Sequence, residues 1–238
     1  MSADNDIRLH LIGKKYIDML LYMGTLELSA TNEIKNVHED LGGIYNIKNL
    51  EGIMPIYSPV GQKRAIIISE SDRSRRTSIV QNVKKSDLLD TYNLCKNLVS
   101  KTDWTHVAYI DDVTLPEALE FDSVDFCTNN DRHSFRKQIN KCTLIFDSRE
   151  RRELYENTDL NSLIILHDPY GCEAIFKDFM VYDYQMEKTD GIHTNGAGDI
   201  FAGIFIREFF NNGLQTAVES SCEITTSLLK QRQENEKI

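Results

Sequence analysis

In the second half of the chain, short continuous runs of apolar residues alternate with stretches in which the apolar residues have helical spacing. The runs at 143–146 and 162–166 are uninterrupted, as expected of strands buried on both faces. Between 199 and 210, apolar residues at 200, 201, 204, 205 and 209 follow the spacing of one helix face. A last helix is predicted from about 214 to 230, with a charged tail that we expect to fray. This alternation predicts an α/β fold with a mostly parallel sheet flanked by helices.

Weaker patterns predict further elements of the same kind. β-branched and apolar runs indicate strands, and Ser or Pro before a periodic stretch indicates the start of a helix. The predicted strands are 106–110, 123–127 and a hairpin of 174–176 with 179–181, and the predicted helices begin at Ser86 and Pro116 or span 134–140 and 149–155.

The first 40 residues have a different character, because extended runs dominate. An apolar strand at 9–13 is predicted to end at Gly13, and a second extended run at 16–22 carries Asp18 among apolar neighbours. Residues 24–40 are polar and lack helical periodicity, so short exposed strands are expected there.

Glycines and a β-branched run mark the next segment. Gly42 and Gly43 predict a tight turn that opens a helix or a short crossover. Residues 65–69 are of strand type, with 76–80 as a hairpin partner. We therefore expect a small strand-rich appendage on the α/β layer.

Length and charge limit the classes of protein that fit. The 238 residues suit one domain, 1–238, with a substantial core. A net charge of −10 repels nucleic acid and anionic membranes, so neither is an expected partner. The basic runs at 73–76 and 149–152 are most simply solvated faces. The N-terminus lacks the features of a signal peptide and no apolar run is long enough to span a bilayer, which predicts a cytoplasmic protein.

The strongest chemical signal is Gly196-Ala197-Gly198-Asp199, where a loop becomes the predicted helix. Backbone N–H groups of such a turn point outward, and the helix dipole adds to them, so the turn stabilises developing negative charge. Asp199, in the first helical turn, is placed to take a proton from a hydroxyl. Taken alone, this pattern also fits a glycine-rich loop with an Asp that caps a helix.

The longer string at 194–203, TNGAGDIFAG, resembles the C-terminal signature of the ribokinase/pfkB carbohydrate kinase family, D-T-x-G-A-G-D-x-F-x-x-G. Two positions differ: His193 replaces the first Asp, and the last Gly of the pattern falls on Ile204, one place after Gly203. The resemblance implies that Asp199 is the catalytic base and that residues 196–198 form the anion hole. It also implies that Thr194 and Asn195 contact the nucleotide. Expected ligands are ATP as the phosphoryl donor, Mg²⁺, and a sugar or nucleoside acceptor.

Weaker similarities imply an acceptor site and a metal-organising residue. Asp18 after Ile12-Gly13 resembles the family's acceptor-binding Asp, although an isolated Asp there is more often a turn or edge residue. Gly42, Gly43 and Asn46 resemble its substrate-side turn, with the spacing one residue short.

Two further segments resemble parts of the family. Asp147-Ser148-Arg149-Glu150 resembles its N-x-x-E element, with Asp147 in place of Asn, which implies that Glu150 holds Mg²⁺ through water. Residues 22–40, with 65–80 as a further candidate, fall where the family has its β lid. That lid often pairs with another subunit, so a homodimer through it is expected.

Other positions depart from the family pattern. Of its T-x-G-x-x-G nucleotide element only Gly171 survives, and Asp168 would bring a carboxylate close to a polyphosphate. The segment between Asn46 and Ala65 is too short for the family's usual strand–helix units. Two hypotheses follow: an ATP-dependent kinase of a sugar, sugar derivative or nucleoside, or a non-catalytic ribokinase-like binding or scaffold protein.

Overall fold

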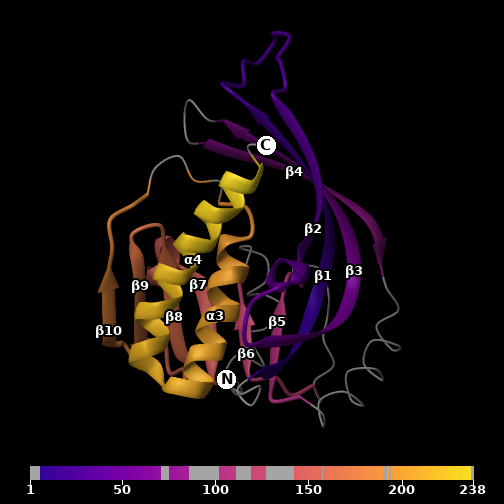
Figure 1. Cartoon of the computed structure of the whole chain (residues 1–238). Helices are drawn as coiled ribbons and strands as arrows, with labels where there is room; N and C mark the ends of the chain where they lie inside the picture. The colour runs from indigo at the N-terminus through magenta and orange to yellow at the C-terminus, as the bar shows by residue number, and fades with distance from the viewer. Residues whose placement is uncertain are drawn as a thin grey trace.

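A computed structural model describes residues 6–70, 75–85, 102–110, 119–126, 142–156, 158–189, 192 and 194–236. In this part of the chain, ten strands form one mixed sheet in the order β10-β9-β8-β7-β6-β5-β1-β3-β4, and β2 pairs with β1 off this path (Figure 1). The strands are β1 Ile7–Met23, β2 Asn36–Gly43, β3 Ile53–Glu70, β4 Arg75–Lys85, β5 Trp104–Ala108, β6 Ser123–Asp125, β7 Leu144–Ser148, β8 Leu163–Asp168, β9 Gly171–Phe176 and β10 Phe179–Gln185.

The centre of the sheet is parallel, and its margins are antiparallel. Neighbours from β3 through β1, β5, β6 and β7 to β8 run in the same direction. β4 lies antiparallel to β3, and β9 and β10 form the expected hairpin beside β8. The prediction of a mostly parallel α/β sheet is confirmed.

β1 is one strand of 17 residues, so the prediction of two runs that separate at Gly13 is wrong. Up to Gly13 one edge of β1 pairs with β5, and from Lys15 onward β2 takes that edge. A Cβ on Gly13 would lie 1.9 Å from the carbonyl oxygen of Ala108. Glycine is therefore required here for close approach of the end of β5, and it does not end the strand.

β3 has 18 residues and runs parallel to β1 over its whole length, with a register shift at Gly13/Lys14. The predicted strand at 65–69 is thus the second half of an 18-residue strand, and 76–80 pairs with it within β4 as expected. The short exposed strands expected throughout 24–40 are limited to β2, which begins at Asn36. Gly42 and Gly43 end that strand, and a 3₁₀ turn, η1 Ile44–Ile47, follows.

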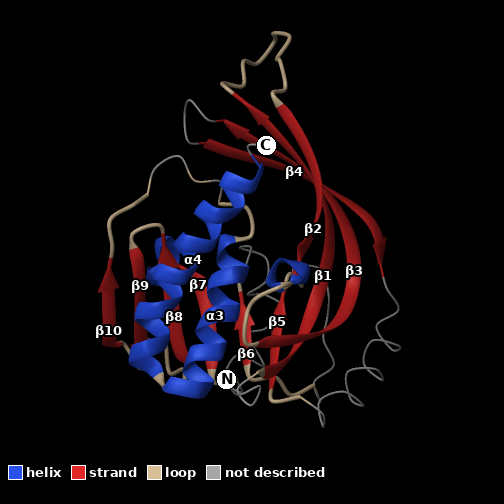
Figure 2. Ribbon diagram, viewed as in Figure 1, coloured by secondary structure: helices blue, strands red, loops and turns tan. Residues whose placement is uncertain are grey.

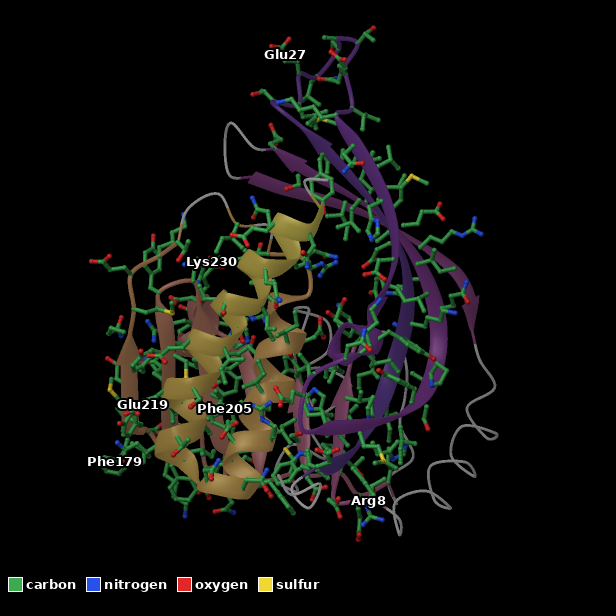
Figure 3. The ribbon with its side chains drawn as sticks, in the orientation of Figure 1. Arg8, Glu27, Phe179, Phe205, Glu219 and Lys230 are labelled. Atoms are coloured by element: carbon green, nitrogen blue, oxygen red, sulfur yellow. The ribbon has the colours of Figure 1, made fainter. Side chains whose placement is uncertain are left out.

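The later halves of β1 and β3, together with β2 and β4, rise beyond the rest of the sheet (Figure 1). We call this part the extension: residues 14–23, 36–43, 61–70 and 75–85. Glu27 lies at its tip and Arg8 at the opposite end of the molecule (Figure 3).

Two α-helices, α3 Ala197–Asn212 and α4 Leu214–Glu236, pack together on one face of the sheet (Figure 2). The first confirms the predicted amphipathic helix. The second continues to Glu236, so the fraying expected after 230 is wrong. Phe205 of α3 (labelled in Figure 3) packs edge-on against Phe146 of β7 at a ring-centroid distance of 5.4 Å. Both residues belong to the buried core between the helices and the sheet.

Residues 149–155 form a 3₁₀ segment, η3 Arg149–Tyr155, instead of the predicted α-helix. Its backbone leaves helical geometry at Arg151. The helices predicted from Ser86, from Pro116 and at 134–140 lie largely outside the described residues. Within the described part, no helix combines the length and the apolar character needed to cross a membrane.

Candidate active site

The turn that begins α3 has the backbone geometry expected of an anion-binding loop. Gly196 has a φ of 72°, a left-handed conformation that favours glycine. The Ala197 amide is engaged within the turn, because it donates to the Thr194 carbonyl at 3.1 Å. Among the described residues, the Gly198 amide has no backbone acceptor. Of the three predicted donors, then, Ala197 is occupied and Gly198 can reach an external anion.

Asp199 lies in the first turn of α3 with only 4% of its surface exposed. Its Oδ2 accepts hydrogen bonds from Asn46 Nδ2 at 2.8 Å and from the Tyr109 hydroxyl at 2.7 Å. Burial raises the pKa of Asp199 to about 7, and the nearby Asp18 charge adds to that rise while the two hydrogen bonds oppose it. A carboxyl with such a pKa suits proton transfer near neutral pH.

A cavity of about 590 Å³ opens beside Asp199. Its walls come from the carboxyl ends of the parallel strands β5 to β8, where open α/β sheets bind ligands, and from α3 and α4. Thr194 and the turn at 196–198 line it, together with Glu150 and His167. The predicted anion turn and base therefore share one cavity.

The predicted acceptor-side residues lie near Asp199 but do not line this cavity. Asn46, in η1, bonds Asp199 directly, and a Cβ on Gly196 would lie 2.8 Å from its amide carbon. A Cβ on Gly42 would lie 1.9 Å from Asp18 Oδ2, and Gly43 has a φ of 66°. The structure thus brings the segment 42–46 next to Asp18 on one side and next to the turn before α3 on the other.

Two residues of η3 account for the Asp at position 147. The buried carboxylate of Asp147 pairs with Arg151 and accepts a hydrogen bond from the Tyr155 hydroxyl at 2.6 Å. Arg151 also donates to the Phe126 carbonyl at 2.5 Å. The negative charge that replaces the family's Asn is therefore matched by a neighbouring cation.

Glu150 is exposed and lines the cavity, while Asp147 is already bonded. Within the described residues no group of three or more His, Cys, Asp or Glu could hold a metal by itself. One carboxylate fits an Mg²⁺ ion whose other ligands are waters and phosphate oxygens, which is the usual arrangement at nucleotide sites. Glu150 therefore fits an Mg²⁺ ion that is bound mainly by the nucleotide.

The altered nucleotide element forms the tight turn between β8 and β9. Arg149 lies 3.6 Å from Asp168 and also 3.4 Å from Asp183, so the Asp168 charge next to the cavity is offset. Gly171 does not line the cavity. A Cβ there would lie 2.0 Å from the Tyr184 carbonyl oxygen, which accounts for this glycine by hairpin packing.

Asn195, predicted to contact the nucleotide, does not reach the cavity either. It is 9% exposed and does not line the cavity, and its carbonyl accepts a 3.3 Å hydrogen bond from Arg232 on α4. His193, which replaces the first Asp of the signature, lies outside the described residues.

The sequence did not single out His167 or Tyr109, although both line the cavity. The His167 ring stacks on Phe201 at 4.6 Å and lies 3.5 Å from where a Cβ of Gly198 would be. Burial lowers its pKa to about 4, so the ring is neutral at pH 7. Tyr109 follows β5 directly and, at a φ of 55°, is left-handed without being glycine. Nothing in the local sequence distinguishes either residue.

No protein-family model matches the chain, and a search of curated proteins gives no match. Solved structures do match. Ribokinase from Thermotoga maritima superposes with a TM-score of 0.61 at 14% identity, over 90% of each chain. Ribokinase from Cryptococcus neoformans var. grubii in complex with ADP gives 0.57 at 12% identity, over 91% of this chain and 92% of that one.

A nucleoside kinase from Burkholderia thailandensis in complex with inosine matches with a TM-score of 0.62 at 10% identity, over 91% of this chain and 89% of that one. These neighbours share one architecture, although two are ribokinases and the third is a nucleoside kinase. The fold predicted from the signature at 194–203 is therefore confirmed. The protein has the fold of the ribokinase/pfkB kinases.

Proposed function

We propose that the protein is an ATP-dependent kinase that phosphorylates a hydroxyl of a sugar, sugar derivative or nucleoside. The observation that carries this proposal is Asp199, a buried carboxyl with a pKa of about 7 at the wall of a 590 Å³ cavity. Next to it the first turn of α3 presents the Gly198 amide. A base beside an anion-stabilising turn is the arrangement that phosphoryl transfer to an alcohol requires.

In the proposed reaction, the acceptor hydroxyl loses its proton to Asp199 as its oxygen bonds to the γ-phosphorus. The bond from that phosphorus to the bridging oxygen breaks, and ADP leaves. Amides at the start of α3 stabilise the charge on the transferring group, and removal of one such donor typically costs about 10²–10³ in rate. Asp18, Gly42, Gly43 and Asn46 contact the acceptor.

The cavity side of the site holds the nucleotide in this proposal. Thr194 and the turn at 196–198 contact its phosphates, and Arg149 limits repulsion from Asp168. When bound, Mg²⁺ neutralises phosphate charge, and Glu150 holds it through water. The neighbours described as an ADP complex and an inosine complex support a nucleotide and a small alcohol as the ligands.

We further propose that the extension is the lid over the acceptor. The exposed side chains of Met19, Ile66 and Ile79 lie side by side on its three adjacent strands β1, β3 and β4. Such an apolar row supports a homodimer paired through this surface.

The alternative, a ribokinase-like binding or scaffold protein, draws on the altered element at 166–171. Calorimetry with Mg-ATP separates the two functions. A kinase binds Mg-ATP at micromolar to millimolar concentration, and Asp199→Asn leaves that affinity nearly unchanged while turnover is lost. No heat of binding at millimolar Mg-ATP would end the kinase proposal. A screen of sugars and nucleosides for ADP release then identifies the acceptor.

A further inference from the structure

Tyr109 is held in an unfavourable backbone conformation next to Asp199. It directly follows β5 and has a φ of 55°, a region that bulky residues rarely adopt because it is sterically unfavourable. Its ring packs against Tyr16 of the extension at a centroid distance of 5.3 Å. Strain of this kind persists where the surroundings hold the residue in place, and it often occurs at functional sites.

The strained backbone aims the Tyr109 hydroxyl at the proposed base. The hydroxyl donates to Asp199 Oδ2 at 2.7 Å, and Asn46 Nδ2 donates to the same oxygen at 2.8 Å. The two donors come from different parts of the chain: Tyr109 directly follows β5, and Asn46 lies in η1. Both side-chain donors converge on Oδ2 and so fix the carboxylate in rotation; among the described residues, neither of these side chains bonds Oδ1.

We propose that Tyr109 is a positioning residue for Asp199: with Asn46 it anchors Oδ2, so that Oδ1 accepts the proton of the acceptor hydroxyl. This inference rests on the proposed kinase function. The proton passes from the hydroxyl oxygen to Oδ1 while that oxygen bonds to phosphorus and ADP departs. Tyr109 keeps its own proton throughout and makes no bond to either substrate.

The same hydrogen bond sets the strength of the base. Burial raises the pKa of Asp199, and the Tyr109 hydroxyl is the first of the groups that oppose this rise. Among the described residues, the other ionisable groups that act on Asp199 or line the same cavity come from β1, β6, η3, β8 and α4. They are Asp18, Asp125, Glu150, Arg151, His167, Asp168 and Cys222. None of them is altered by removal of the tyrosine oxygen.

Tyr109→Phe tests the inference, because it keeps the ring against Tyr16 and removes only the hydroxyl. We expect the acid limb of kcat/KM to move upward by about one pH unit, since a hydrogen bond to a charged group is worth about this much. We also expect kcat on the plateau to fall about 10-fold with the KM values unchanged. The matched control is Tyr184→Phe, which removes a hydroxyl that bonds Glu223 at 2.7 Å and does not line the cavity.

An unchanged acid limb and plateau in Tyr109→Phe would overturn the inference. So would a rise in the acceptor KM alone, since that would make Tyr109 a substrate contact. A second readout does not depend on turnover. Carbon-13 NMR of the Asp carboxyl groups, with the Asp199 signal assigned by its loss in Asp199→Asn, should show titration about one pH unit higher in Tyr109→Phe. If the wild type transfers no phosphoryl group, the kinase proposal fails, yet this titration still decides whether Tyr109 tunes Asp199.

Discussion

A buried carboxyl costs the folded protein free energy whenever it is ionised, and Asp199 is such a group. Its pKa in the folded state is about 7, against 3.8 for an ordinary Asp side chain. The folded state therefore holds the Asp199 proton more tightly than the unfolded chain does. Its contribution to stability is complete below pH 4 and is lost as the pH rises through about 7.

Asp199→Asn should accordingly stabilise the protein at high pH. At pH 8 the expected gain in the free energy of unfolding is on the order of 4 kcal/mol, because the neutral amide avoids the cost of a buried charge. The gain should shrink as the pH falls and vanish near pH 4. Urea denaturation of both proteins from pH 4 to 8 measures it, and an equal difference at all pH values would contradict the assigned pKa.

At the scale of single residues, the sequence could predict site residues whose contacts are local in the chain, but not those whose contacts are long-range. Asp199 and Gly196 were predictable because the turn and its helix are contiguous in sequence. Tyr109 was not predictable, because its hydroxyl meets Asp199 across 90 positions of the chain and no local motif marks it. Gly171 was assigned to the nucleotide from its position in a motif, whereas hairpin packing against Tyr184 accounts for it.

At the scale of elements, the turn before α3 depends on two separate properties of Gly196. It has a positive φ, and a Cβ there would press on the Asn46 side chain at 2.8 Å. Gly213, before α4, also has a positive φ, of 85°, but a Cβ there would meet nothing within 4 Å. Comparing substitutions at these two glycines therefore distinguishes the effect of backbone strain from the effect of displacing Asn46.

We expect Gly196→Ala and Gly213→Ala both to lower the melting temperature, because alanine disfavours these conformations by about 1 kcal/mol or more. Only Gly196→Ala should also reduce kcat, by about 10²-fold, because Asn46 is pushed away from Asp199. Steady-state kinetics well below both melting temperatures provides the measurement. Equal kcat values in the two variants would show that the contact with Asn46 has no role in turnover.

η3 and the β8–β9 turn are linked by Arg149. Its guanidinium lies within 4.0 Å of Asp168, Glu173 and Asp183, and only Asp168 of these lines the cavity. Arg149→Ala should weaken Mg-ATP binding by about 10-fold, because the Asp168 charge then faces the polyphosphate without compensation.

Two variants complete that test by calorimetry. Adding Asp168→Asn to Arg149→Ala should restore the affinity. Arg152→Ala, which loses only the pair with Glu173, should leave it unchanged. If Arg149→Ala binds Mg-ATP as the wild type does, Asp168 does not face the nucleotide.

Among the elements, the strands of the parallel core were predictable from continuous apolar runs, whereas the continuity of β1 was not. A glycine after an apolar run usually predicts a strand end, but Gly13 serves the close approach of β5. The 3₁₀ form of η3 was not predictable either, since its backbone follows from the bonds of Arg151 and Tyr155 to Asp147.

For the whole molecule, the order of the ten strands depends on pairings across the chain that no periodicity reveals. The fold class and the family resemblance could be predicted, because strand and helix patterns and the signature at 194–203 are local. The extension could only be placed approximately. Its strands β1 and β3 are continuous with those of the core, so no change in pattern marks where it begins.

The proposed dimer is a prediction at this scale. Ile66→Glu places a charge in the middle of the apolar row of Met19, Ile66 and Ile79, so we expect the dimer to dissociate. Val181→Glu is the control, because Val181 is also an exposed β-branched residue but lies on β10 at the opposite edge of the sheet. Sedimentation velocity should show a wild-type dimer, an Ile66→Glu monomer and a Val181→Glu dimer. A monomeric wild type would refute pairing through the extension.

The central claim is that Asp199 promotes transfer of a phosphoryl group from ATP to an alcohol. Phosphorus-31 NMR of the protein with Mg-ATP and the acceptor found by the screen tests it directly. The wild type should produce a phosphate monoester in amounts equal to ADP, and Asp199→Asn should produce at least about 100-fold less. Release of inorganic phosphate without an ester, or equal ester formation by the two proteins, would contradict the account.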